Sequence, residues 1–158
     1  MAAQLNYNYS TPKGVPGGKF DLVFDEVVTR TNEEEDSKMK YGLAVAVGAN
    51  VGTGVKLPST GITADKIEGV TVAIPTTEHD INGKVIVKKG ASLGVMKRGN
   101  IWGRLATGVT PVYGKTAYVV VTGDDVGAFT TDSSNTVDIG AKFGNVADKD
   151  NGIAVILL

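Results

Sequence analysis

The feature that most constrains the fold of this chain is the shortness of its apolar runs. Almost every run is rich in β-branched residues and is closed by glycine, asparagine, aspartate or proline, which is typical of short strands joined by tight turns. Strands are therefore predicted at residues 19–23, 27–31, 41–47, 67–74, 84–87, 92–97, 101–106, 116–121, 128–131, 137–145 and 153–157. This spacing favours a barrel or sandwich over alternating strands and helices. The sequence thus predicts an all-β fold, a single compact barrel-like or sandwich-like domain of short antiparallel strands with an extended N-terminal arm.

The turn residues predict where strands reverse. Asn82-Gly83 and Asn151-Gly152 are strong hairpin signals, because a type I′ turn needs positive φ at both central residues. Residues 124–127 predict a slightly longer hairpin, and residues 48–61 a loop or a loose hairpin.

Helix is expected only as single turns. Residues 33–40 have helical propensity but lack an apolar face, so a charged loop or one turn is favoured there. Residues 63–66 could form one capped turn before the strand at Ile67.

The composition bounds the class of protein. A chain of 158 residues with 42% hydrophobic residues is one domain by length and can bury a core. Its 21 glycines are scattered, which suggests many tight turns. Cysteine is absent, which excludes disulfides and thiolate metal sites, and no apolar run approaches a membrane span.

The first eighteen residues read as an extended arm in front of a barrel-like domain at 19–158. Leu5, Tyr7 and Tyr9 alternate with polar neighbours, and the prolines and glycines from Pro12 to Gly18 exclude a helix. The segment has neither the cationic nor the apolar region of a signal peptide. Such an arm has little to pack on within its own chain, so we expect a neighbouring subunit to hold it.

Charge is segregated along the chain although the net charge is only −1. No aspartate or glutamate lies between Ile81 and Gly123, whereas that stretch contains Lys84, Lys88, Lys89, Lys97, Arg98, Arg104 and Lys115. Acidic residues collect at 33–36 and in the last third of the chain. Either these are solvated strand faces and turns, or basic and acidic surfaces meet between subunits. On the second interpretation, some of these cations face acidic groups of another chain.

Motifs for phosphate, metal or acid-base chemistry are incomplete. Residues 108–116 resemble a P-loop but have one residue too many between the glycines, and a strand follows instead of a helix. His79 is the sole histidine, so a zinc site is not expected and an exposed turn position is favoured. Residues 148–152 begin like a calcium loop but lack the downstream bidentate carboxylate. The acidic pair at 124–125 and the acidic cluster at 33–36 are better interpreted as solvated charge.

Trp102 stands near Arg98, Arg104 and Tyr113 and could form a platform for stacking bases. Single-strand binders usually carry several aromatic residues on one sheet face, and only 6% of this chain is aromatic. A core or interface position is therefore favoured for Trp102, and nucleic-acid binding is not.

Several segments together resemble the structural cement, or capsid decoration, proteins of tailed bacteriophages. They are residues 5–21, 40–45, 66–72, 96–104 and 112–119, with the apolar C-terminal strand. The resemblance covers most of the chain in order and implies a small β-rich protein that binds the outside of a capsid and reinforces it. It implies the major capsid protein and further copies of this chain as partners, often as a homotrimer at local threefold axes.

The same resemblance implies no enzymatic activity, no cofactor, no metal and no membrane partner, and a place on the virion exterior after assembly in the host cytoplasm. The residues predicted to contact the capsid or a neighbouring subunit are Leu5, Tyr7, Tyr9, Pro12, Lys88, Lys97, Arg98, Trp102 and Arg104.

Two other classes of function remain open from the sequence. A small-ligand or carbohydrate-binding barrel of a phage tail or adhesin would have a concave pocket lined by Trp102 and tyrosines. A hydrolytic barrel would require His79 to lie against a carboxylate and a hydroxyl in a cleft.

Overall fold

The computed structural model describes residues 13–158 apart from residues 36, 76, 77 and 80. These residues form eleven strands and one turn of 3-10 helix, η1 (Ala64–Lys66). The prediction of an all-β fold is confirmed.

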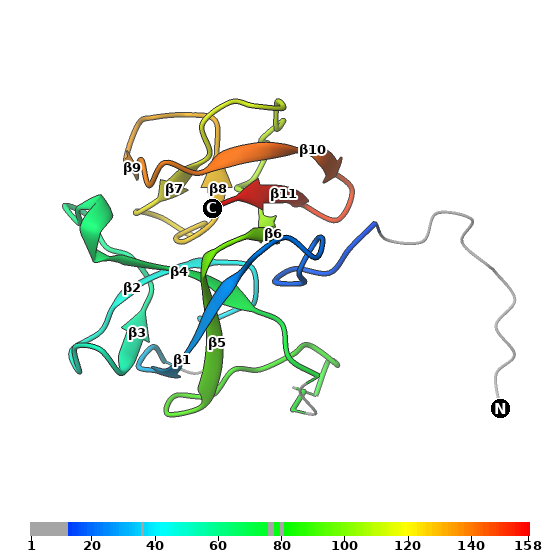
Figure 1. Cartoon of the computed structure of the whole chain (residues 1–158). Helices are drawn as coiled ribbons and strands as arrows, with labels where there is room; N and C mark the ends of the chain where they lie inside the picture. Colours follow the sequence, from blue (N-terminus) through cyan, green and yellow to red (C-terminus); the bar gives the residue numbers. More distant parts are fainter. Residues whose placement is uncertain (1–12, 36, 76–77, 80) are drawn as a thin grey trace, which may run out of the picture.

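Five strands close into a barrel in the order β1-β3-β2-β4-β5 (Figure 1). They are β1 (Glu26–Asn32), β2 (Ala44–Val47), β3 (Gly54–Lys56), β4 (Ile67–Val72) and β5 (Ser92–Arg98). Only the β1–β3 pair is parallel. The interior is filled by a cluster that includes Met39, Val45, Val55, Leu93 and Val95, all buried. Alternate inward-facing residues of short strands therefore supply this core.

Two small sheets lie above the barrel in Figure 1. One has the order β10-β11-β6, from β10 (Lys142–Asp148), β11 (Ile153–Leu157) and β6 (Asn100–Arg104). The other has the order β8-β7-β9, from β8 (Phe129–Thr130), β7 (Tyr118–Val120) and β9 (Thr136–Val137). A second core that includes Val70, Met96, Ile101, Phe129 and Phe143 joins both sheets to the barrel, so the barrel and the sheets form a single packed body.

Gly103 shows how closely the layers approach. A Cβ atom at this position would lie 2.6 Å from Cγ1 of Ile156 and 2.8 Å from Cδ2 of Phe129. No side chain fits there, so glycine is required for this contact.

Several expected elements differ from the structure. Residues 48–61 contain β3, which pairs with β2 and so forms the loose hairpin that was one of the two predictions for this segment. The same strand also pairs with β1, which was not predicted. Residues 19–23 and 84–87 form no ladder and take part only in isolated bridges, Lys19 with Ile101 and His79 with Val85. Each bridge is made where a loop passes a strand or another loop for one residue.

The type I′ assignment of both Asn-Gly turns is wrong. Gly83 and Gly152 have φ of 77° and 62°, but neither Asn82 nor Asn151 has a positive φ. The backbone N–H of Gly152 donates to the carbonyl oxygen of Lys149 at 3.1 Å, so glycine closes a four-residue loop between β10 and β11. Loops of this length are usually built on a type I turn, which needs left-handed geometry only at its end.

The longer hairpin at residues 124–127 and the single turn at residues 63–66 form as predicted, but the expected side-chain cap of that turn does not. The segment before β8 forms the longer hairpin, with the N–H of Gly127 donating to the carbonyl of Val120 at 2.9 Å. The turn η1 follows Thr63 in an extended conformation, although the threonine side chain makes no cap hydrogen bond.

Candidate functional site

The root of the N-terminal arm, residues 13–18, lies on the domain's own surface around Trp102. The N–H of Gly17 donates to the carbonyl of Trp102 at 2.7 Å, and the N–H of Trp102 donates to the carbonyl of Gly18 at 2.8 Å. The N–H of Ala73 donates to Gly17 at 2.8 Å. This section of the arm therefore covers the free edge of β6, and the expectation that the arm has little to pack on is wrong for it.

Glycine makes this close approach possible. A Cβ at Gly14 would lie 2.2 Å from Cε2 of Trp102, which is inside the van der Waals contact distance. Gly17 has φ of 79°, and a Cβ there would lie 2.7 Å from the backbone nitrogen of Ala73. Backbone without side chains thus lies directly on the indole.

Trp102 itself is buried, with 4% of its surface exposed. The expectation of a core or interface position is met by burial within this chain. The indole packs with Ile153 and Val155, and the Phe20 ring meets it edge-on with centroids 5.7 Å apart. The ring therefore supports the arm root and does not face solvent in this chain, whereas the sequence predicted that it would contact the capsid or a neighbouring subunit.

A second attachment holds the beginning of the described chain. The backbone N–H of Lys13 donates to Oδ2 of Asp148 at 3.2 Å, and its Nζ donates to the carbonyl of Ala147 at 3.2 Å. The side chain of Asn151 donates to the same carboxylate at 2.8 Å. The hydrogen bonds that this carboxylate accepts lower the pKa of Asp148, and the bond from the Asn151 side chain has the largest effect, followed by that from the Lys13 backbone. The residues that resembled a calcium loop thus clamp the arm root.

Three cations of the basic segment, defined as the stretch from Ile81 to Gly123 that lacks acidic residues, pair with carboxylates of their own chain. Nζ of Lys88 lies 3.2 Å from Glu78, Nζ of Lys89 lies 2.7 Å from Glu35, and Nζ of Lys97 lies 3.4 Å from Glu68. These pairs could not be predicted from the sequence, because the carboxylates lie outside the basic segment and only the fold brings them beside it. The first two pairs are largely exposed and contribute little to stability.

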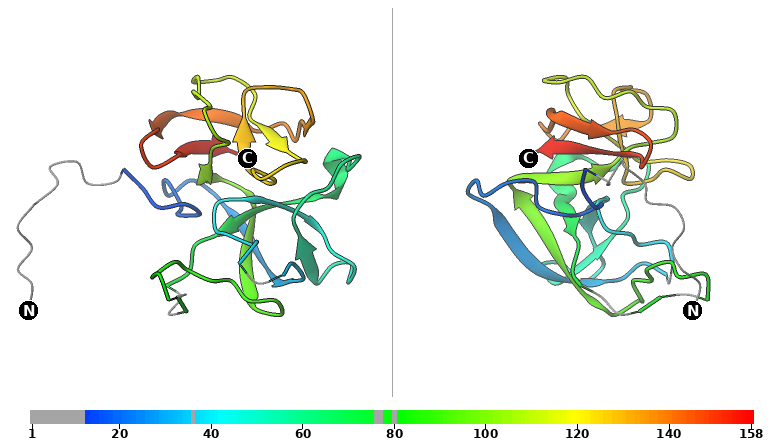
Figure 2. Two further views of the ribbon diagram at one scale, coloured as in Figure 1. Left: turned by 180° about the vertical axis from the view of Figure 1, so that it is seen from behind. Right: turned by 90° about the vertical axis from the view of Figure 1, so that its right-hand side faces the viewer.

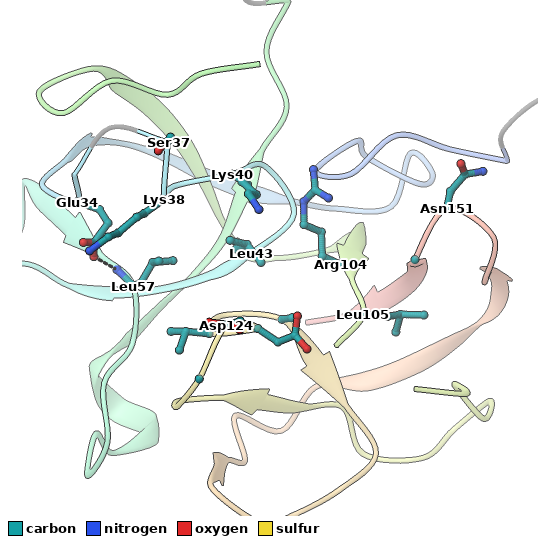
Figure 3. A pocket seen from close by; sticks show the side chains of 15 residues that line it. Glu34, Ser37, Lys38, Lys40, Leu43, Leu57, Arg104, Leu105, Asp124 and Asn151 are labelled. Carbon is teal, nitrogen blue, oxygen red and sulfur yellow. Dashed lines mark hydrogen bonds between the residues drawn. The ribbon is translucent and has the colours of Figure 1, made fainter. Parts of the chain in front are cut away.

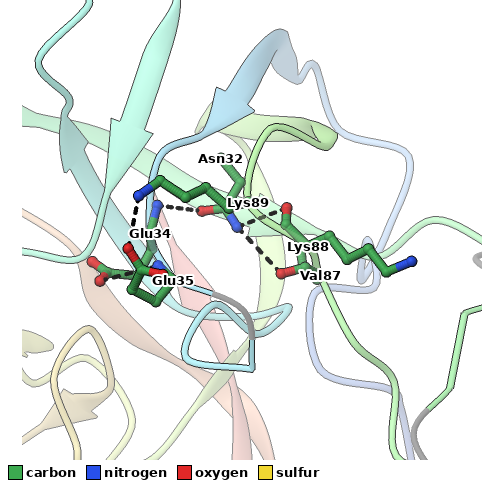
Figure 4. A network of polar contacts seen from close by, with 6 residues as sticks. All are labelled: Asn32, Glu34, Glu35, Val87, Lys88 and Lys89. Carbon is green, nitrogen blue, oxygen red and sulfur yellow. Dashed lines mark hydrogen bonds and ion pairs between the residues drawn. The ribbon is translucent and has the colours of Figure 1, made fainter.

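Asn32 positions the loop that carries Lys88 and Lys89 (Figure 4). Its side chain is fully buried and donates to the carbonyls of Val87 at 3.2 Å and Lys88 at 3.0 Å. Its Oδ1 accepts the N–H of Glu34 at 2.9 Å. A loop without regular strand structure is thereby held in one conformation.

The remaining predicted cations have different surroundings. Arg98 is exposed at the end of β5, with Glu26 opposite it across the β1–β5 pair. Arg104 is partly buried, its Nε donates to the carbonyl of Tyr41 at 2.8 Å, and burial lowers its pKa. The guanidinium of Arg104 lies between two cavities and lines both.

The first cavity, of about 650 Å³, is mostly polar and is lined by residues such as Glu34, Lys40, Arg104 and Asp124 (Figure 3). The second, of about 660 Å³, is lined mainly by apolar side chains of Val15, Ile74 and Val85. Trp102 and His79 line neither cavity. These two cavities therefore lack the arrangement expected for a tryptophan-lined sugar pocket or a histidine-based cleft.

Leu5, Tyr7, Tyr9 and Pro12 lie outside the described residues. Within those residues no cluster of metal-ligating side chains occurs, and no helix is long and apolar enough to cross a membrane.

Sequence reasoning missed one exposed apolar group. Leu22, Val23 and Phe24 protrude just before β1, in a stretch predicted to be mostly strand. The signal available was an apolar triplet without alternation, enclosed by Asp21 and Asp25.

Comparisons with known proteins agree with this architecture. The sequence model of the family described as structural cement protein (E217 gp24/Pam3 gp6) matches residues 3–158. A chain of a solved structure titled "The capsid of Myoviridae Phage XM1" has a TM-score of 0.75 and 12% identity, covering 99% of this chain and 97% of that chain. At this identity the likeness shows a shared fold. No curated protein matches the sequence. Because the family match spans nearly the whole chain, the protein belongs to the phage structural cement proteins, which have a structural and not an enzymatic role in the virion capsid.

Proposed function

We propose that this protein binds the outer surface of an assembled phage capsid and stabilises the shell, with the N-terminal arm as its main attachment. The observation that carries the proposal is the anchored arm root. Residues 13–18 are fixed by backbone hydrogen bonds to Trp102 and by the Asp148 clamp. Because the arm root is fixed on the domain, a partner that binds the arm would also hold the domain in place.

The arm has the chemistry for strand addition. In an extended conformation Leu5, Tyr7 and Tyr9 would fall on one side of the chain, and the backbone would offer donors and acceptors to a partner strand or loop. Pro12 restricts the conformations open to the unbound chain in front of the fixed root, which lowers the entropy lost on docking. The receiving surface would belong to the major capsid protein or a neighbouring cement subunit.

Stabilisation of the shell then follows by mass action. A ligand that binds the assembled lattice and not its free subunits shifts the equilibrium toward the lattice. A homotrimer at local threefold axes would engage three arms at once, and linked contacts raise the overall affinity beyond that of a single arm.

The exposed cations complete the proposed contact surface. Arg98, Lys88 and Lys97 lie at the surface, where carboxylates of a partner could compete with the intrachain pairs of the two lysines. Reversing the charge of two of these residues should weaken capsid binding and reduce its salt dependence. Unchanged binding across a salt series would assign them to the solvated surface.

The structure sharpens the deletion that tests the arm. Removing residues 2–12 leaves the root on Trp102, so the variant should fold with the stability of the full chain but fail to co-sediment with capsids lacking cement protein. Removing residues 2–18 should also uncover the indole and lower stability. A matched pair of triple alanine variants compares Leu5, Tyr7 and Tyr9 with Gln4, Asn6 and Asn8 on the opposite side of the strand.

We expect only the first triple variant to lose retention on capsids. Particles carrying the full-length protein should also release DNA at a higher temperature than bare particles. Wild-type occupancy by the protein lacking residues 2–12 would refute the attachment role of the arm.

A further inference from the structure

Three apolar side chains before β1 form an exposed wedge, defined as Leu22, Val23 and Phe24. Leu22 is fully exposed, Phe24 is 80% exposed and Val23 is 46% exposed. Val27, on β1, is a further exposed apolar residue, with 40% of its surface exposed. Exposed apolar residues that are grouped in this way mark a contact with another molecule more often than isolated exposed residues do.

The wedge is held at both ends by built contacts. Asn100 donates its side-chain N–H to Oδ2 of Asp21 at 2.8 Å, and Lys19 forms an ion pair with Asp25. Before the wedge, Phe20 turns inward onto the Trp102 ring. The backbone therefore presents the apolar side chains outward in a fixed loop, and little conformational entropy is lost when a partner covers them.

The second cavity, called here the groove, is a concave apolar surface large enough to receive such side chains. Val15, Ile74 and Val85 line it and are 59%, 44% and 43% exposed. Its cationic lining residues are Lys40, Lys84 and Arg104, and no carboxylate lines it among the described residues.

Charge is complementary between the two surfaces. The wedge is flanked by Asp21, Asp25 and Glu26, which outnumber the nearby cations Lys19 and Arg98. The charged side chains that line the groove are all cationic. In the right-hand view of Figure 2, the loop before β1 and the segment bearing Lys84 lie on opposite sides of the molecule. At its Lys84 end the groove is therefore separated from the wedge of the same copy, and the wedge of another copy can enter it there.

We propose that the wedge of one copy inserts into the groove of a second copy, in a head-to-tail contact. The inference rests on the self-association in the proposed function and names the surfaces that make it. A contact between two different surfaces generates a ring when the rotation closes. It also gives Arg104 an acidic neighbour from another chain, as the charge segregation of the sequence suggests.

The two surfaces can be removed separately. The wedge variant carries Leu22→Ser and Phe24→Ser, and the groove variant carries Ile74→Arg and Val85→Arg, which add bulk and positive charge. Val51→Ser is the matched control, because Val51 is 82% exposed and lies in the turn between β2 and β3. Leu22, Phe24 and Val51 are largely exposed, and Ile74 and Val85 are each more than 40% exposed, so thermal unfolding monitored by circular dichroism should match that of the wild type.

Sedimentation velocity over a concentration series measures the outcome. The wild type and the control should associate beyond the dimer, and each variant alone should be a monomer. An equimolar mixture of the two variants retains one intact wedge and one intact groove, so it should form a dimer and nothing larger. Such complementation is specific to a head-to-tail contact.

A wild-type protein that stays monomeric, variants that still associate, or a mixture that stays monomeric would each overturn the proposal. Co-sedimentation with capsids separates this result from the proposed function. Loss of capsid binding on deleting residues 2–12, together with variants that associate normally, would refute only the wedge and groove. Retention of that deletion on capsids would refute only the arm.

Discussion

Replacing Trp102 by alanine tests the assignment of the indole as the support of the arm root. The ring is almost completely buried among Phe20, Ile153 and Val155. Deleting a buried large aromatic side chain costs about 3–5 kcal/mol, and loss of the edge-on pair with Phe20 adds about 0.5–1.5 kcal/mol. The glycine-rich root can partly collapse into the space, which reduces the cavity contribution. We therefore expect the free energy of unfolding to fall by about 4 kcal/mol.

Urea unfolding followed by far-ultraviolet circular dichroism is the appropriate assay. Trp102 is the sole tryptophan, so its fluorescence would vanish with the mutation. Tyr113→Ala serves as the control, since that side chain is 73% exposed and its removal should change stability by less than about 0.5 kcal/mol. A loss below about 2 kcal/mol for Trp102→Ala would refute the supporting role, because the ring would then contribute no more than a surface contact.

Three further changes test neighbouring contacts. Gly14→Ala should lift the arm root from the indole and speed protease cleavage before the barrel, which limited proteolysis detects; unchanged cleavage would contradict the close contact. Glu68→Gln should cost about 2–3 kcal/mol in urea unfolding, because it leaves Arg30 partly buried without its carboxylate at 3.2 Å; a neutral effect would contradict this. Because the pKa of Asp148 is lowered, its carboxylate stays ionised, and keeps its bond to Lys13, as pH falls through the ordinary carboxyl range. The bond is lost as pH falls through the lowered pKa. The amide shift of Lys13 should follow that titration, and a constant shift would refute the clamp.

Local chemistry predicted the fold class well and its exact pairings less well. Runs of β-branched residues closed by turn residues were enough to predict most barrel strands. The short strand β3 was anticipated only as part of a loose hairpin, and its pairing with β1 was not predicted, because Gly54–Lys56 is stabilised by pairing with β1 and β2 and not by its own composition. The turn at Asn151-Gly152 was assigned the wrong type because loop length, set by the register of β10 and β11, overrides the dipeptide preference.

The contact surfaces were harder to predict for a physical reason. The sequence shows that a stretch lacks acids but not which distant carboxylates the fold brings to it, as Glu68 beside Lys97 demonstrates. Exposure of Leu22 and Phe24 is equally hidden, because an apolar triplet is most simply assigned to a core. Burial of Trp102 could be predicted, whereas its covering by Gly14 depends on a contact between residues far apart in the chain.

One residue connects the two proposed attachments. The backbone of Trp102 holds Gly17 and Gly18 at the arm root, while its ring supports Phe20 at the base of the wedge. A pull on either attachment is therefore resisted by β6, whose partner strand β11 lies in the main core. If both proposed attachments form on a capsid, pressure in the shell would load the arm and the intersubunit contact together. Because the arm root and the base of the wedge are both anchored on β6, this buried strand would carry the force between the two attachments.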